Sequence, residues 1–150
     1  MEVESILHNG SIYLDTNIFI YALEGYAEYS EVIRKIFRAI DQGAVQAVTS
    51  ELTLAEALVK PFLVQDESLV ALYQSVIQNS SVLSVHPLNR QLLIRAARTR
   101  AQTASRISLA DAVHLATARS MQCHSFLTND RRLLRQQPDD LAIILLEHLI

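Results

Sequence analysis

The stretch IYLDTNIFIYAL, from Ile12 to Leu23, decides the fold of this 150-residue chain. Its first residues form a short apolar run that is typical of a buried strand, and the apolar spacing becomes helical after Asp15. Asp, Thr and Asn are all good residues for the start of a helix, so we expect a helix to begin at Thr16 or Asn17. A carboxylate at this point either caps the helix or projects from the carboxyl edge of a parallel sheet toward a ligand.

The rest of the chain alternates short apolar or β-branched runs with helical patterns, an order that predicts an α/β fold. The expected strands are Ser11–Asp15, Ala44–Val48, Val82–Leu88, His124–Thr128 and Leu141–Leu146. The expected later helices are Glu28–Gln42, Ser50–Lys60 ended by Pro61, Glu67–Gln78, Asn89–Thr103, Ser108–Met121 and Asp130–Gln136. Half of the residues are apolar, enough to bury a substantial core, and we expect one domain, residues 1–150.

Several classes of protein are disfavoured by composition. An apolar stretch such as Leu141–Leu146 is far shorter than the roughly 20 residues that a membrane helix needs. The N-terminus has no basic-then-apolar secretion pattern, so we expect a cytoplasmic protein without membrane contacts. A single cysteine, Cys123, excludes an intrachain disulfide and a multi-cysteine metal site, and we expect it to be a small buried hydrophobe.

Charge is distributed unevenly along the sequence. The segment from Leu88 to Gln136 holds nine arginines against two acids, Asp111 and Asp130, and therefore carries a net charge of +7, whereas the rest of the chain carries −10. Two isolated acids in a basic segment are what a metal site facing a polyanion would contain. The alternative is that the arginines cover solvated helix faces with their long side chains.

Glu56, in SELTLAEAL, is the second candidate acid after Asp15. Thr53 and Glu56 have the spacing of a capping box, which would give the glutamate a purely structural role. Ser50 is the better cap, however, and it would place Glu56 nearly two turns inside the helix, at the boundary of the apolar stripe. Glu51 competes for the functional role, and we favour Glu56.

Asp111 and Asp130 complete the set of candidate acids. Asp111 also has a capping-box partner, Ser108, but it lies in an otherwise apolar helix, where an acid is costly unless something satisfies it. His114, three residues later, either shares a metal with Asp111 or is a hydrogen-bonded core residue, and we favour the core position. Asp130 follows an expected strand that ends at Thr128, and capping alone would explain it.

Chance capping explains each acid singly better than it explains all four at four junctions. Clustered carboxylates repel one another without cations, and hard oxygen donors suit Mg2+ or Mn2+. Two ions about 4 Å apart could activate a water for in-line attack on a phosphodiester. In this hypothesis Asp15 and Asp111 are the core ligands, Glu56 positions or deprotonates the water, and Asp130 holds the second ion. Arg98, Arg100, Arg131 and Arg132 are arginines that could guide the phosphate backbone.

Taken together, YLDTNIFIYAL, SELTLAEAL, LADAVHLATA and FLTNDRRLL resemble, in order and interval, the PIN-domain ribonucleases and in particular the VapC-type toxins of prokaryotic toxin–antitoxin pairs. The resemblance implies a three-layer α/β/α fold around a parallel sheet and a metal-dependent endoribonuclease site. The residues that it assigns to the catalytic and metal-binding site are Asp15, Glu56, Asp111 and Asp130.

The same resemblance implies roles for other residues and for partners. Asn17 and Thr128 match positions that support the site by hydrogen bonding, whereas His114 matches a position without a catalytic duty. A homodimer and a small antitoxin, with an antitoxin arginine entering the acidic site, are also implied, and the substrate would be RNA.

Two other functions fit parts of the pattern. The acidic pocket of a non-catalytic interaction module would receive a basic partner segment in place of metal. A metal-dependent phosphatase would cleave small phosphomonoesters. The haloacid-dehalogenase type of phosphatase needs a second Asp two positions after the first, and that position here is Asn17. Divalent metal at the four acids distinguishes an enzyme from the interaction module.

Overall fold

The computed structural model describes residues 2–8, 10–103 and 106–150. These residues form one sheet of five strands, all parallel, in the order β3-β2-β1-β4-β5. The strands are β1 (Ser11–Leu14), β2 (Gln46–Ser50), β3 (Leu83–His86), β4 (Ser125–Thr128) and β5 (Ala142–Leu145). The chain runs from β1 outward to β3 and then returns to β4, so the order reverses between β1 and β4. In open parallel sheets such a switch point is where ligands bind, at the carboxyl ends of the strands.

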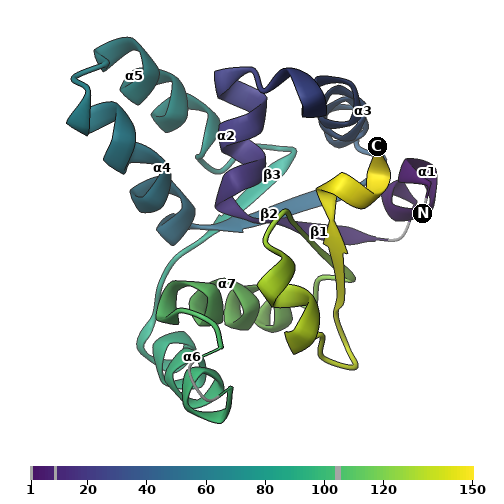
Figure 1. Ribbon diagram of the computed structural model, residues 1–150, viewed down its shortest axis with the longest axis vertical. Coiled ribbons are helices and arrows are strands. Elements are labelled where there is room, and N and C mark those ends of the chain that lie inside the picture. The colour runs from purple at the N-terminus through teal and green to yellow at the C-terminus, as the bar shows by residue number, and fades with distance from the viewer. Residues whose placement is uncertain (1, 9, 104–105) are drawn as a thin grey trace.

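Helices cover both faces of this sheet (Figure 1). One layer contains α1 (Val3–Leu7), α2 (Thr16–Glu24), α3 (Ser30–Asp41), α4 (Glu51–Leu63) and α5 (Glu67–Val76), with the 3-10 turn η1 (Ala27–Tyr29). The other layer contains α6 (Arg90–Gln102), α7 (Leu109–Ser120) and the 3-10 turn η2 (Arg131–Gln136), and η3 (Leu146–Leu149) follows β5. The predicted three-layer α/β/α fold is therefore confirmed.

Alternation along the strands explains the two layers. Ile12 and Leu14 of β1 pack into the layer of α2 and α3, whereas Tyr13 between them packs into the layer of α6 and α7. Tyr13 stacks there on Phe126 of β4, with ring centroids 4.9 Å apart. Because both faces are covered, the strands read as nearly continuous apolar runs. No helix in the described ranges is long and apolar enough to cross a membrane.

Several element boundaries differ from those expected, and one short helix was not expected. Helix α4 continues through Pro61 to Leu63, and the buried proline removes one backbone hydrogen bond without ending the helix. The second strand begins at Gln46, two residues later than expected. Gly43, with a φ of 75°, ends α3, and the amide of Ala44 still bonds to Ala39 in that helix. Helix α1 was not predicted at all.

Candidate active site

Asp15 lies at the carboxyl end of the central strand, at the switch point. Its carboxylate is buried, with 7% of the residue exposed, and it accepts hydrogen bonds from the Thr16 amide at 2.8 Å and the Thr128 hydroxyl at 2.7 Å. Burial raises the pKa of Asp15, against the lowering effects of His114, Thr128 and Thr16. The negative charge of Asp111 adds to the increase. The aspartate thus caps α2 and also forms a buried negative charge that a cation would stabilise.

Glu56 reaches the same place from α4. Ser50 caps this helix, as expected, by accepting a hydrogen bond from the Leu52 amide. One carboxylate oxygen of Glu56 accepts hydrogen bonds from Thr16 Oγ1 at 2.7 Å and from His114 Nε2 at 2.5 Å. Burial alone would raise the pKa of Glu56, but the hydrogen bond and positive charge of His114 lower it. Glu51, the competing candidate, is instead exposed at the first position of α4.

His114 lies between two of the predicted acids. It is 1% exposed, its Nδ1 is 2.6 Å from the hydroxyl of Tyr13, and its Nε2 is 3.8 Å from an Asp15 oxygen. Burial would lower the pKa of His114, but the hydrogen bond from its ring to Glu56 and the charges of Asp15, Glu56 and Asp111 raise it. The sequence correctly indicated a hydrogen-bonded core histidine. Its position between Asp15 and Glu56 was not predicted. One signal was available, because a residue three positions after Asp111 lies on the same helix face as that acid.

Asp111 forms the capping box that its spacing suggested. One of its oxygens accepts a hydrogen bond from the Ser108 amide at 3.1 Å, and its own amide donates to the Ser108 hydroxyl at 3.0 Å. The same carboxylate oxygen lies 3.9 Å from Nη2 of Arg132. The capping box therefore explains the position of Asp111 at the start of α7. Its carboxylate can still interact with a cation, as the approach of Arg132 shows.

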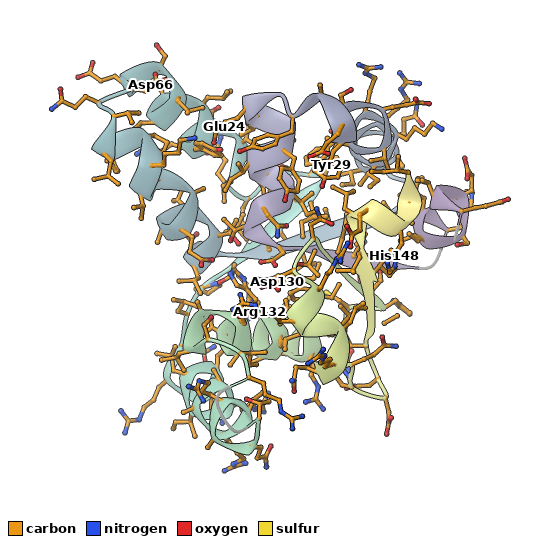
Figure 2. The ribbon with its side chains drawn as sticks, in the orientation of Figure 1. Glu24, Tyr29, Asp66, Asp130, Arg132 and His148 are labelled. Carbon is orange, nitrogen blue, oxygen red and sulfur yellow. The ribbon has the colours of Figure 1, made fainter. Side chains whose placement is uncertain are left out.

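Asp130 is joined to Asp111 through Arg132. Asp130 caps η2 by accepting the Arg132 amide at 3.0 Å, and it accepts a second bond from Arg132 Nη2 at 2.6 Å. This arginine lowers the pKa of Asp130. Figure 2 shows Asp130 and Arg132 next to each other. Arg132 was among the arginines that could guide phosphate, and in the structure its guanidinium bonds to Asp130 and lies near Asp111.

The two predicted supporting residues differ in their contacts. Thr128 donates its hydroxyl to Asp15 and accepts the Asp130 amide at 3.1 Å, so it connects two of the acids. Asn17, in contrast, has a buried side-chain oxygen that is the one buried side-chain polar atom without a hydrogen-bond partner in residues 2–8, 10–103 and 106–150. A buried acceptor of this kind is costly unless water or a cation satisfies it.

The donor set fits a hard divalent cation in type and charge, but it is not assembled around one. No group of three His, Cys, Asp or Glu side chains among the described residues surrounds a point that a metal ion could occupy. The reason is that the acids face donors of their own chain, as Glu56 faces His114 and Asp130 faces Arg132. Displacing Arg132 would remove its guanidinium from oxygens of Asp111 and Asp130, which are hard donors of the kind that Mg2+ prefers.

The fold is that of an α/β protein, with a parallel sheet between two helical layers. Its polar site contains carboxylates and lies at the switch point, on the carboxyl edge of the sheet. The PIN domain model matches residues 12–137, and the chain belongs to the PIN domain family. A search of curated proteins gave no match.

Solved structures with the same fold include complexes from three bacteria. VapBC2 from Rickettsia felis bound to a promoter DNA fragment is 14% identical, with a TM-score of 0.69 over 90% of this chain and 98% of that chain. DNA-bound VapBC from Salmonella typhimurium is 22% identical, with a TM-score of 0.68 over 91% and 98%. A toxin–antitoxin complex from Klebsiella pneumoniae is 19% identical, with a TM-score of 0.63 over 87% and 95%. At these identities, the likeness establishes a shared fold.

Proposed function

We propose that this protein is a divalent-metal-dependent endoribonuclease that acts as the toxin of a toxin–antitoxin pair. The observation that carries the proposal is the buried carboxylate of Asp15 at the switch point. The negative charge of Asp111 contributes to its raised pKa, and the carboxylate lies beside His114, which bonds to Glu56. PIN domains are generally nucleases, which supports this class of activity. The complexes that share the fold support a small antitoxin as the partner.

Each acid has a role in this proposal that follows from its surroundings. Asp15 and Asp111 would hold the first ion, and Asp130 would hold a second. When bound at these residues, two such ions would supply positive charge to the attacking and leaving oxygens of a phosphodiester. Glu56 has a lowered pKa and is a carboxylate at neutral pH, so it accepts a hydrogen bond from the attacking water and orients it. His114 holds the Glu56 side chain in place through the 2.5 Å hydrogen bond.

The proposal is tested by incubating purified protein with a mixture of structured RNAs in Mg2+, in Mn2+ or in a chelator. We expect discrete cleavage products with metal and none with the chelator, because the four acids need cations to bring a phosphodiester close. Folded protein that cuts no RNA under any of these conditions contradicts the proposed activity. The lengths of the RNA products also distinguish internal cutting from removal of terminal nucleotides.

One observation favours the alternative, an interaction module whose acidic pocket binds a basic partner segment. Arg132 shows that Asp130 and Asp111 accept a guanidinium group, with Nη2 at 2.6 Å from one and 3.9 Å from the other. Arginine matches carboxylates through its planar fork of donors. A partner arginine could replace Arg132 without any metal.

Removing Arg132 distinguishes the two functions. We expect Arg132→Gln to bind Mn2+ roughly 3- to 10-fold more tightly than wild type in isothermal titration, because a partly exposed positive charge beside two metal ligands is lost. The control is Arg131→Gln, since Arg131 pairs with Glu147 at 2.6 Å instead of with a site acid. Equal Mn2+ affinity in both variants contradicts the prediction. Binding of an arginine-rich peptide but not of Mn2+ would favour the interaction module.

A further inference from the structure

Beside the acids, the structure contains a hollow of about 440 Å3 that is lined by three arginines, Arg106, Arg132 and Arg135. Arg132 and Arg135 come from η2, whereas Arg106 comes from the segment that precedes α7. Because three cationic side chains border one hollow, we expect the free energy of this arrangement to fall when an anion enters.

Two of these arginines carry charge that the chain does not neutralise. Arg106 and Arg135 are exposed, and neither forms an ion pair with a carboxylate in the part of the chain that the structure describes. Arg119 and Arg131, in contrast, pair with Asp140 and Glu147. Arg106 and Arg135 therefore differ from Arg119, Arg131 and Arg132, which lie beside acids.

We infer that this hollow binds a backbone phosphate of the RNA strand, an inference that rests on the proposed ribonuclease activity. The planar donors of arginine bind two oxygens of one phosphate, which a lysine cannot do. Arg132 borders both the hollow and the acids, so a strand with a phosphate in the hollow passes directly beside the site.

A long polyanion fits the surface better than a small anion does. A second hollow of about 400 Å3, on the same helical layer, is lined by Arg95, Arg98 and Arg119, and also by Asp140, which pairs with Arg119. The segment from Leu88 to Gln136, which supplies the arginines of both hollows, carries a net charge of +7. Repeated phosphates along one strand can occupy several such places at once, which a single carboxylate or phosphate ion cannot.

The position of Arg132 connects this binding to the acids. In the free protein its guanidinium bonds to Asp130 at 2.6 Å and lies 3.9 Å from Asp111. A phosphate in the hollow competes with both carboxylates for the same guanidinium. Binding of RNA thus draws the Arg132 guanidinium away from the two carboxylates, which keep their backbone hydrogen bonds to Ser108 and Arg132.

The experiment measures RNA affinity in a chelator, where binding is separated from cleavage. A fluorescein-labelled hairpin RNA is titrated with wild type, with Arg106→Gln/Arg135→Gln and with a control, and anisotropy is followed at several salt concentrations. The control is Arg34→Gln/Arg38→Gln, which removes the same charge from exposed positions on α3, in the opposite layer. Circular dichroism and thermal unfolding verify that all three proteins are folded.

We expect the double variant in the hollow to bind the RNA roughly 10- to 100-fold more weakly than wild type, since two charge-assisted contacts are lost. The slope of log affinity against log salt should become shallower by about 0.7 to 0.9, the value for one phosphate contact, and the control should match wild type. Wild-type affinity in the hollow variant, an equal loss in the control, or no RNA binding by wild type would each overturn the inference. RNA binding that depends on the hollow, without metal-dependent cleavage by wild type, would retain the phosphate site and refute the nuclease.

Discussion

Asp15→Asn is expected to reduce metal-dependent RNA cleavage by about 1,000-fold or more while leaving the fold intact. The substitution removes the buried negative charge but keeps an oxygen that can accept the Thr16 amide, so the helix cap survives. Because burial raises the pKa of Asp15, losing its charge should not lower the free energy of unfolding in a chelator. Activity and stability are thereby separated in one variant.

The measurement is single-turnover cleavage of a structured RNA in Mg2+, together with the shift of the unfolding temperature that Mn2+ causes. Wild type should be stabilised by Mn2+, and Asp15→Asn should not. The matched control is Asp66→Asn, since Asp66 caps α5 through the Leu69 amide at 3.1 Å and lies far from Asp130 (Figure 2). Cleavage by Asp15→Asn at the wild-type rate would refute the assignment of Asp15. Asp111→Asn should behave like Asp15→Asn, because the amide oxygen can still accept from Ser108.

His114→Ala is expected to lower the free energy of unfolding by about 2 to 4 kcal/mol in a chelator. The substitution leaves a cavity and removes the hydrogen-bond partner of the Tyr13 hydroxyl and of Glu56. Urea denaturation of wild type and variant measures the difference. His148→Ala serves as the control, since His148 is exposed near the C-terminus, and it should change stability little. Equal effects of the two substitutions would contradict a structural role for the buried network.

The stabilisation by His114 should depend on pH in a defined direction. Its folded pKa is raised above the ordinary value of 6.5, so its contribution is complete below about pH 6.5 and is lost as the pH rises through the folded pKa. The folded pKa of Glu56 is lowered from 4.5, so its contribution is present above that pH and is lost as the pH falls through the folded pKa. The difference in stability between wild type and His114→Ala should therefore be largest between about pH 4.5 and 6.5. A difference that grows from pH 6.5 to pH 9 would contradict this assignment.

Short-range signals in the sequence predicted several parts of the site correctly. Ser50 caps α4, and Ser108 and Asp111 form a capping box, because both interactions join residues only two or three positions apart. The position of Asp15 after a buried strand followed in the same way from the apolar run before it. The catalytic and metal-binding roles of the four acids stay predictions that the experiments above address.

Contacts between residues far apart in the chain could not be predicted from the sequence. His114 reaches Glu56 across 58 positions of the chain and Tyr13 across 101 positions. Each residue alone fitted an ordinary local role, since a tyrosine in a buried strand and a histidine in an apolar helix are both common. Arg132 was assigned to phosphate binding because of its charge, and its pairing with Asp130 and Asp111 depends on how η2 packs beside α7.

The sequence by itself determined the α/β class, the alternation of strands and helices, and the positions of the acids at their junctions. These features depend on apolar periodicity and on hydrogen bonds between near neighbours, which act within a few residues of the chain. Only the tertiary structure decided which donor each carboxylate faces, with His114 beside Asp15 and Glu56, and Arg132 between Asp111 and Asp130. The physical reason is that charge interactions depend on distance in space, and that distance is set when the strand order brings the ends of β1, β2 and β4 to one edge.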